Sequence, residues 1–294
     1  MSAARVALLT GSALVAFAAN SVLCRLALFG ASIDPATFSV VRILTGAVTI
    51  GVLVATRQGG SLRAAWHAGT WRGALLLVLY AFPFSYAYVD LSAGVGALLL
   101  FGTVQVTMIL YALATGERLA AIQWSGLALA FAGLTYLSFP GIEAPSLQGS
   151  ALMVLAGLGW GGYSLVGRGA SRPLRATAGN FLRASPFALA FAATVFGPKL
   201  EGMHWSSAGL AWSAASGALA SGLGYALWYA ALAHLSGVHA AVVQLSVPLL
   251  AAIGGLLFLS ESPSTRLVVA AGGILGGVGL TVLGRRSVRE RGGG

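Results

Sequence analysis

The segment DLSAGVGALL, residues 90–99, is matched later in the chain by HLSGVHAAVV, residues 234–243. At the same spacing Glu117 aligns with Glu261, and each glutamate follows a long apolar run. Two similar segments at a constant spacing indicate that one unit of the chain is repeated. Such a repeat would determine the whole fold.

Weaker matches support the same interpretation. They pair GLTYL (133–137) with GLTVL (279–283), NSVLCR (20–25) with YSLVGR (163–168), and VVR (40–42) with FLR (181–183). Coincidence explains any one of these matches but not their common order. We therefore expect two similar units, residues 1–144 and 145–294.

The composition indicates a protein surrounded by lipid. Hydrophobic residues make up 57% of the chain and charged residues 8%, and the mean hydropathy is +0.87. A soluble domain carries about 25% charged residues, so this chain cannot cover a water-facing surface. The net charge of +10 comes from arginines between apolar runs. Because no basic stripe with interleaved aromatic residues occurs, we expect no nucleic-acid partner.

Ten segments are long and apolar enough to span a membrane, which requires about 20 residues each. They cover about 6–28, 35–56, 73–90, 94–115, 121–139, 149–167, 176–197, 208–233, 238–259 and 266–284. Asp34 directly before Pro35 is a typical helix start. The connecting loops are too short for a soluble domain. The predicted fold is an all-α membrane protein with ten transmembrane helices.

The positions of arginine predict the orientation of these helices. With the N-terminus inside, the cytoplasmic segments hold Arg5, Arg57, Arg63, Arg72, Arg118, Arg168, Arg172, Arg175, Arg285, Arg286, Arg289 and Arg291. The outer loops hold only Lys199 and Arg266 as basic residues. We therefore expect both termini in the cytoplasm.

Five spans per unit is an odd number, so the second unit enters the membrane from the opposite side. Glu117 then lies inside and its counterpart Glu261 outside. Two inverted-topology repeats are a known basis of secondary transporters, which move two bundles about a site near the membrane midplane. The chain contains no ATP-binding motif, so transport is expected to run on a substrate or ion gradient unless a separate subunit supplies energy.

The pattern resembles the drug/metabolite transporter superfamily, and within it the EamA-type branch. The resemblance rests on the ten spans, the LS...A pattern before spans four and nine, and the glutamate after each of these spans. A Trp in the first helix of a repeat is present as Trp160, but the first repeat has Phe17 to Asn20 there instead. Within the family the chain most resembles amino-acid exporters of the YddG type. The resemblance implies a central cavity lined by spans one, three, four, six, eight and nine.

Three polar side chains within spans are candidates for binding a substrate: Asn20, Gln105 and Gln244. Polar groups in a membrane tend to face a cavity or one another. Asn20 and Gln105 would suit a zwitterionic ligand near the midplane, but bonds to neighbouring helices explain them equally well.

Aromatic residues gather in the spans that the resemblance assigns to the cavity. The candidates for its lining are Tyr80, Phe84, Phe101, Trp160, Tyr163, Tyr225 and Trp228. Such walls suit a substrate with an apolar side chain, with Tyr hydroxyls adding polar contacts. We assign Tyr88, Trp71, Trp124 and Trp205 instead to the interfacial belts of the membrane.

Arginines and prolines within the spans are candidate gating elements. Arg42 and Arg183 form an inverted pair, and a buried Arg costs about 2.5–3.5 kcal/mol by insertion scales. For Arg25 we favour snorkelling towards the headgroups. Pro83 and Pro248 each remove a helix hydrogen bond, which allows either a hinge or a static kink.

No catalytic centre, cofactor or metal site is expected. His234 and His239 lie across a predicted helix break, at a poor spacing for a shared metal. The lone Cys24 argues against a disulfide or structural zinc. GLGWGG (157–162) spells a dinucleotide motif, but it lies inside a span and follows no strand, so we interpret it as helix packing.

The sequence therefore predicts a secondary transporter of a small organic metabolite in the bacterial inner membrane. Export of amino acids, including apolar and aromatic ones, is implied by the resemblance alone. A nucleobase, a quaternary amine or a drug is the alternative cargo, and an intramembrane enzyme the alternative class. Small residues around Gly272 and Gly276 allow a homodimer through spans five and ten, although packing within one chain is favoured.

Overall fold

The computed structural model describes residues 2–58, 61–116, 120–138, 144–167, 170–198, 200–232, 234–235 and 243–291. These ranges are helical and contain no β-strand, apart from one isolated bridge between Ile33 and Trp205. Glu117, Arg118, Arg168, Lys199 and His239 lie outside the described residues. The chain is an all-helical protein, as predicted.

The helices are α1 (Ala3–Leu28), α2 (Pro35–Gln58), α3 (Leu62–Ala68), α4 (Trp71–Ala87), α5 (Ala93–Ala114), α6 (Ala121–Ser138), α7 (Leu147–Gly167), α8 (Pro173–Phe196), α9 (Ser207–Ala215), the π-helix η1 (Ser216–Leu223), α10 (Gly224–Leu232), α12 (Val247–Leu259) and α13 (Thr265–Arg291). Four of them are long and apolar enough to cross a membrane: α1, α2, α5 and α7. Shorter apolar helices occur in α6, α12 and α13. The molecule is thus a multi-pass membrane protein.

Each of the ten predicted segments contains helical residues, but two details differ from prediction. The short helix α3 was not predicted, because its seven residues are too few for a span and do not form a long apolar run. The segment 238–259 is described from residue 243 on. The count of ten spans therefore stays a prediction.

Side-chain caps begin several helices where the chain turns. Asp34 Oδ1 accepts a hydrogen bond from the Thr37 amide at 2.8 Å, which confirms the predicted start of α2. Thr70 Oγ1 accepts from the Gly73 amide at 2.9 Å and begins α4. Such caps satisfy amide groups that have no partner within the helix.

The predicted span at 208–233 is interrupted by a π-helical stretch. η1 lies between α9 and α10 and packs against α2 at Gly217. A Cβ added to Gly217 would lie 2.0 Å from Thr45 Oγ1 and 2.3 Å from the Arg42 carbonyl oxygen. Glycine therefore permits the close contact that brings η1 to the middle of the bundle.

A second interruption lies in the predicted ninth span. Residues 243–244 are helical, residues 245–246 form a turn, and Pro248 lies in the first turn of α12. Proline fits this position because a first-turn residue needs no amide donor. Pro248 thus begins a helix after a break, whereas Pro83 lies inside α4.

Close helix contacts in the bundle depend on glycine. The GLGWGG segment lies in α7, and a Cβ added to Gly159 would lie 2.7 Å from the Tyr80 amide nitrogen of α4. Gly157 similarly faces Thr103 of α5. These contacts confirm that the segment is a helix-packing motif.

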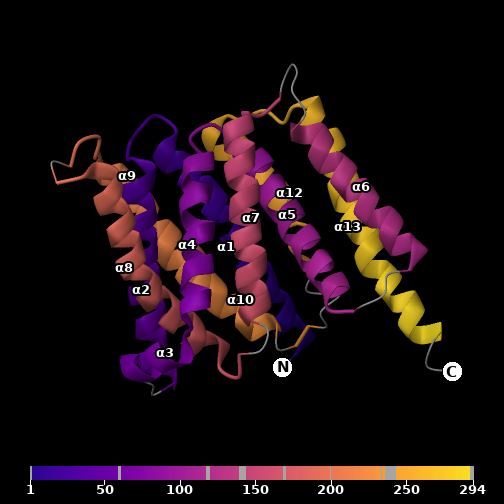
Figure 1. Ribbon diagram of the computed structural model, residues 1–294, viewed down its shortest axis with the longest axis horizontal. Helices are drawn as coiled ribbons and strands as arrows, with labels where there is room; N and C mark the ends of the chain where they lie inside the picture. The colour runs from indigo at the N-terminus through magenta and orange to yellow at the C-terminus, as the bar shows by residue number, and fades with distance from the viewer. Residues whose placement is uncertain are drawn as a thin grey trace.

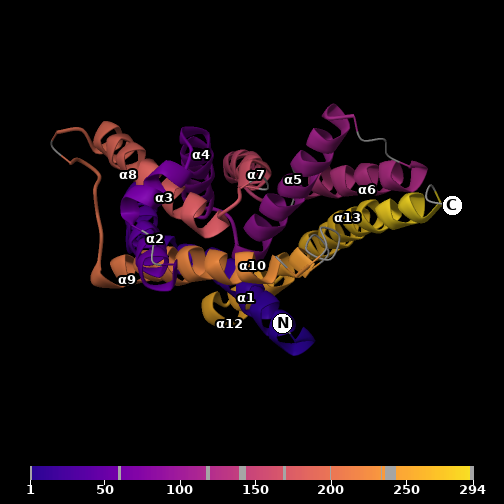
Figure 2. The same ribbon diagram turned by 90° about the horizontal axis from the view of Figure 1, so that it is seen from below.

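The helices form a main bundle and a separate pair (Figures 1 and 2). In the main bundle, α4 packs against α7, α2 against α8 and η1, and α1 against α10 and α12. α6 and α13 pack mainly against each other and extend to one side. Gly277 faces α6, where a Cβ would meet the Gly126 carbonyl oxygen at 2.4 Å, whereas Gly272 and Gly276 face open space.

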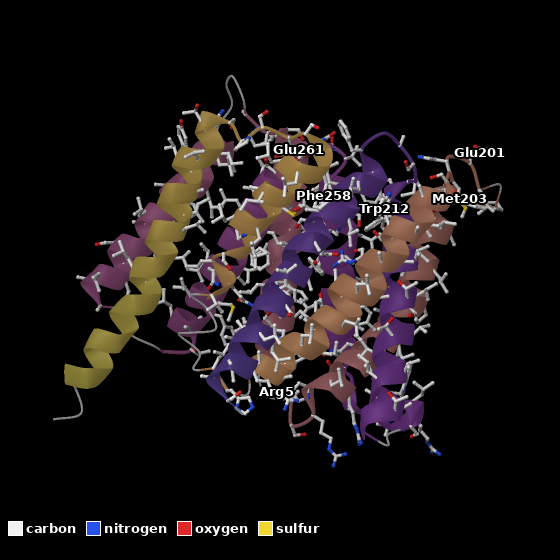
Figure 3. The ribbon with its side chains drawn as sticks, turned by 180° about the vertical axis from the view of Figure 1, so that it is seen from behind. Arg5, Glu201, Met203, Trp212, Phe258 and Glu261 are labelled. Carbon is white, nitrogen blue, oxygen red and sulfur yellow. The ribbon has the colours of Figure 1, made fainter. Side chains whose placement is uncertain are left out.

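The beginning of α1 and the end of α13 lie at the same end of the molecule, at the bottom of Figure 1. Figure 3 shows Arg5 at this end and Glu201 and Glu261 at the opposite one. Both labelled glutamates therefore lie at the end of the bundle opposite Arg5.

Candidate functional site

A small cavity lies in the middle of the main bundle, where α1, α4, α5, α7, η1 and α10 meet. Its lining consists of Phe17, Asn20, Ser21, Tyr80, Phe84, Leu100, Phe101, Trp160, Ala220 and Tyr225. About 20 Å³ is open to the centre of a water molecule. This space holds a water molecule but no organic metabolite, so a larger ligand requires the walls to move apart.

Six of the predicted binding residues line this cavity: Asn20, Tyr80, Phe84, Phe101, Trp160 and Tyr225. The spans that supply them are five of the six that the family resemblance implies. α12 contributes no residue to the lining.

Four predicted binding residues lie elsewhere. Tyr163 and Trp228 are buried directly behind residues that line the cavity. The Tyr163 ring stacks on Trp160, with 5.5 Å between ring centroids, and the Trp228 ring contacts Phe17 edge-on at 5.7 Å. Gln105 is buried in α5, one turn beyond the cavity. Gln244 lies beside the helix break before α12, so it does not line the cavity.

Sequence reasoning missed Phe17, Ser21, Leu100 and Ala220 as lining residues. Phe17 precedes Asn20 by three positions, which places both on one face of α1, and this signal was available. Leu100 and Ala220 are ordinary apolar residues of long spans. Nothing in the sequence distinguishes them from residues that face lipid.

Aromatic rings form a continuous wall around Trp160. Its ring centroid lies 5.0 Å from that of Tyr80 and 5.0 Å from that of Tyr225. Phe84 extends the wall, with its ring 5.2 Å from Tyr80. Tilted contacts at these distances are favourable and leave ring faces available to an apolar ligand.

A chain of hydrogen bonds crosses the cavity wall. The Ser216 hydroxyl donates to Asn20 Oδ1 at 2.6 Å, and Asn20 Nδ2 donates to the Tyr80 hydroxyl at 3.0 Å. Arg42 Nη2 donates to the same hydroxyl at 2.7 Å, and Arg42 Nε donates to Ser221 Oγ at 3.3 Å. The network therefore joins α1, α2, α4 and η1.

Arg42 is buried beside the cavity, only 3% exposed. Its guanidinium carbon lies 4.8 Å from the ring centroids of both Tyr80 and Phe84, which are lining residues. The arginine forms no ion pair with any described residue, and its Nη1 has no hydrogen-bond partner. The structure thus places this predicted gating residue at the wall of the central cavity.

Arg183, the predicted counterpart of Arg42, lies beside α3, near the end of the bundle where α1 begins. Its Nη1 donates to the carbonyl oxygen of Trp66 in α3, and the guanidinium lies 4.5 Å from the Trp66 ring centroid. Nearby, Asn180 Oδ1 accepts from the Thr70 amide at 2.8 Å. Arg183 and Asn180 therefore attach α3 and the start of α4 to α8.

Arg25 does not snorkel, and this prediction was wrong. Its Nε lies 3.0 Å from Glu261 Oε1, and its Nη1 donates to the carbonyl oxygens of Tyr88 and Val89 at 3.0 and 2.6 Å. Glu261 Oε2 also accepts from the Ala93 amide at 2.8 Å. These partners satisfy the charges within the protein, so the arginine has no need to reach the headgroups.

Tyr88 is likewise not part of an interfacial belt, because it is completely buried. Its hydroxyl donates to the Ala93 carbonyl oxygen at 3.4 Å. Trp71, Trp124 and Trp205 are exposed, at 50%, 52% and 57%, as belt residues would be. Tyr88 thus belongs to the buried core at the turn between α4 and α5.

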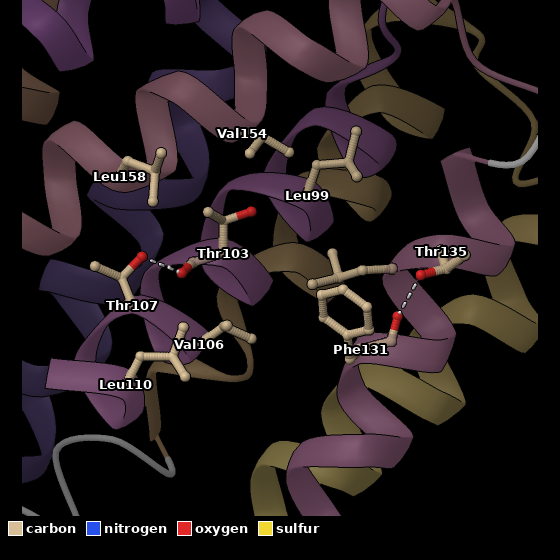
Figure 4. Close-up of a pocket in the computed structure, with 10 residues that line it drawn as sticks. Leu99, Thr103, Val106, Thr107, Leu110, Phe131, Thr135, Val154 and Leu158 are labelled. Atoms are coloured by element: carbon tan, nitrogen blue, oxygen red, sulfur yellow. Dashed lines mark hydrogen bonds between the residues drawn. The ribbon is translucent and has the colours of Figure 1, made fainter. Parts of the chain in front are cut away.

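A larger hollow of about 560 Å³ opens on the side of the molecule between α5, α6 and α7 (Figure 4). Its lining is Leu99, Thr103, Val106, Thr107, Leu110, Phe131, Leu134, Thr135, Val154 and Leu158. The hydroxyls of Thr107 and Thr135 donate to carbonyl oxygens of their own helices. The hollow therefore presents an apolar surface without a converging polar group, unlike the central cavity.

The described residues contain no group of three His, Cys, Asp or Glu side chains that could hold a metal ion. His234 closes the turn after α10 through its amide, which donates to the Ala231 carbonyl oxygen at 2.9 Å. His239, for which no metal role was expected, lies outside the described part of the chain. The candidate site is thus the central cavity.

Comparison with known proteins gives the family. The model of the EamA-like transporter family matches residues 147–283. A protein of Pseudomonas aeruginosa without an assigned function is 49% identical over 288 residues, which are 97% of this chain and 98% of that protein. The chain therefore contains an EamA-like transporter family domain. Members of this family are transporters, and the drug/metabolite transporter resemblance is confirmed.

Two more distant similarities concern an exporter and a solved structure. A probable terminal-alkyne amino-acid exporter of Streptantibioticus cattleyicolor is 28% identical over 225 residues, covering 74% of this chain and 73% of that protein. A solved crystal structure superposes with a TM-score of 0.63 at 19% identity, covering 94% of this chain and 99% of that one. The second similarity concerns the fold alone.

Proposed function

We propose that this EamA-like protein is a secondary transporter that exports amino acids, including apolar and aromatic ones, by alternating access at the central cavity. The observation that carries the proposal is the cavity itself. Aromatic rings from widely separated helices surround it, and a polar network built on Asn20 and Tyr80 crosses its wall. Such a site combines apolar surface with a few converging polar groups, as ligand sites do.

The packing of the helices supports two inverted repeats, residues 1–144 and 145–294. α4 packs against α7 as α1 packs against α10, and α5 packs against α7 as α1 packs against α12. If α1, α2, α4, α5 and α6 correspond in order to α7, α8, the span of α9 to α10, α12 and α13, each of these contacts has its counterpart in the other half. Two repeats related by a twofold axis would produce this pattern.

The charge distribution supports a cytoplasmic location for both ends of the chain. Arg5 and the exposed Arg63 lie in segments at the end where α1 begins, and Glu201 and Glu261 lie at the other end. Positive charge favours the cytoplasmic side. In a bacterial inner membrane, the Arg25–Glu261 pair then lies towards the outside and α3 towards the inside.

Alternating access requires contacts that separate on one side while those on the other side close. Arg25 with Glu261 joins α1 to the end of α12, and Arg183 with Trp66 joins α8 to α3. These two contacts lie near opposite ends of the bundle. The break before Pro248 and the π-helical turn of η1 supply places where helices can bend. We therefore propose Arg25 as a gating residue alongside the predicted Arg183, with Pro83 as a further bend. Arg42, the other predicted gating residue, lies beside the central cavity instead.

Amino acids as cargo are supported by the similarity to the probable amino-acid exporter of Streptantibioticus and by the aromatic wall. Counterflow in liposomes tests this directly. Vesicles that contain the purified protein and unlabelled phenylalanine should take up labelled phenylalanine faster than empty vesicles, with and without a pH gradient. Uptake equal to that of empty vesicles for all amino acids would contradict the cargo. Uphill uptake that requires a pH gradient would instead contradict an uncoupled mechanism.

A further inference from the structure

One nitrogen of the Arg42 guanidinium is unused beside the cavity. Nε donates to Ser221 and Nη2 donates to Tyr80, but the buried Nη1 has no hydrogen-bond partner among the residues that the structure describes. A guanidinium has five N–H donors in a fixed plane, and it forms two parallel bonds with a carboxylate. The N–H groups of Nη1 are thus available to donate to an anion.

The charge of Arg42 is also uncompensated within the described part of the chain. No carboxylate there lies within ion-pair distance, and the ring faces of Tyr80 and Phe84 supply only the partial compensation of cation–π contacts. Burying an ion without a counter-charge is unfavourable in a membrane. Arg25, by contrast, has Glu261 and two carbonyl oxygens.

The cavity next to Arg42 also contains groups that can bind a cation, although it has no carboxylate among its described lining residues. None of the described lining residues is charged, so the arginine determines the sign of the electrostatic potential there. Asn20 Oδ1 and the aromatic faces are the groups available to an ammonium. A cation alone would meet a positive field without a carboxylate to bind it.

We propose that Arg42 binds the carboxylate of the cargo, so that this site accepts anionic and zwitterionic compounds and rejects cations. The inference rests on the proposed transport function and extends it to the selectivity of the site. The aromatic wall then holds the side chain of the cargo. Because Tyr80 and Phe84 separate the guanidinium from the cavity, the carboxylate reaches Nη1 when these rings move on opening.

The test uses matched compounds that share one benzyl group: phenylalanine, 3-phenylpropionate, phenylalanine amide and phenethylamine. Thermal unfolding of the detergent-purified full chain reports binding without any flux. We expect phenylalanine and 3-phenylpropionate to raise the unfolding temperature, and the two cationic compounds to leave it unchanged. Equal stabilisation by phenethylamine, or none by either carboxylate, would overturn the proposal.

Variants then locate the binding group. Arg42→Gln should weaken the response to 3-phenylpropionate at least about tenfold, as expected for loss of a charged hydrogen bond, and Arg42→Lys should weaken it less. Arg5→Gln, at an exposed arginine far from the cavity, is the matched control and should respond like the wild type. An unchanged response in a folded Arg42→Gln protein would overturn the assignment. If that variant does not fold, the comparison of the four compounds on the wild-type protein still tests whether the site accepts carboxylates and rejects cations.

The two proposals fail in different ways. Absence of amino-acid counterflow with intact stabilisation by carboxylates would contradict amino-acid export but support the anion site. Counterflow of phenylalanine that phenethylamine inhibits as strongly as 3-phenylpropionate would support transport and contradict the role of Arg42.

Discussion

Arg25 of α1 and Glu261, which follows α12, form an ion pair between residues 236 positions apart, with Nε and Oε1 separated by 3.0 Å. The same arginine donates to two carbonyl oxygens after α4, and the same glutamate accepts from the first turn of α5. One pair of side chains thus joins four helices at the end of the bundle opposite the N-terminus. Opening this end requires breaking these bonds together.

Replacing Glu261 with Gln should open this end, because the substitution leaves the buried guanidinium of Arg25 without its counter-charge. Cys24, the single cysteine of the chain, is buried on α1 beside Arg25. We expect a membrane-impermeant maleimide to label Cys24 slowly in the wild-type protein and several-fold faster in Glu261→Gln. Cys24→Ala measures the background. Equal labelling rates would show that the pair does not hold the end closed.

Replacing Trp160 with Ala should abolish most transport while membrane insertion stays intact, because its ring is the centre of the aromatic wall. Trp228→Ala should have a smaller effect, since Trp228 contacts the wall only through Phe17. Trp124→Ala, at an exposed ring, is the control. Counterflow and the amount of protein in the membrane fraction are the two measurements. Transport that survives both inner substitutions would mean that these rings serve packing alone.

Replacing Tyr80 with Phe keeps the ring but removes the hydroxyl that accepts hydrogen bonds from Asn20 and Arg42. Leaving buried donors unsatisfied costs about 1–3 kcal/mol, and more for a charged group. We expect a lower unfolding temperature in detergent than for the wild type. Tyr111→Phe, at an exposed tyrosine, should unfold like the wild type. Similar values for both variants would contradict a structural role of the network.

Replacing Gly217 with Ala should destabilise the protein by about 1–3 kcal/mol, the usual range for overpacking. The new Cβ would meet Thr45 Oγ1 and the Arg42 carbonyl oxygen, so η1 must move away from α2. Gly272→Ala is the matched control, because a Cβ there meets nothing within 4 Å. Unfolding temperatures of the two variants give the comparison. A stable Gly217→Ala protein would mean that α2 and η1 can separate without loss.

Sequence patterns predicted the elements well where length and hydropathy decide them. The start of α2 at Asp34 and Pro35 and the apolar helices α1, α5 and α7 lie where they were expected. α3 was missed, since a short helix held by Arg183 has no strong signal of its own. Most aromatic candidates line the cavity because aromatic residues in long apolar spans are few enough to be informative.

The sequence alone determined that the chain lies in a membrane, roughly where its helices begin and end, and which family it resembles. These properties depend on local composition, because lipid demands apolar runs of a certain length. Only the tertiary structure decided that Arg25 pairs with Glu261, and that Arg42 lies beside Tyr80 and Phe84 without a carboxylate partner among the described residues. Such contacts depend on how each helix is rotated about its axis and packed against distant helices. Hydropathy gives little information on this rotation when most faces of a span are apolar.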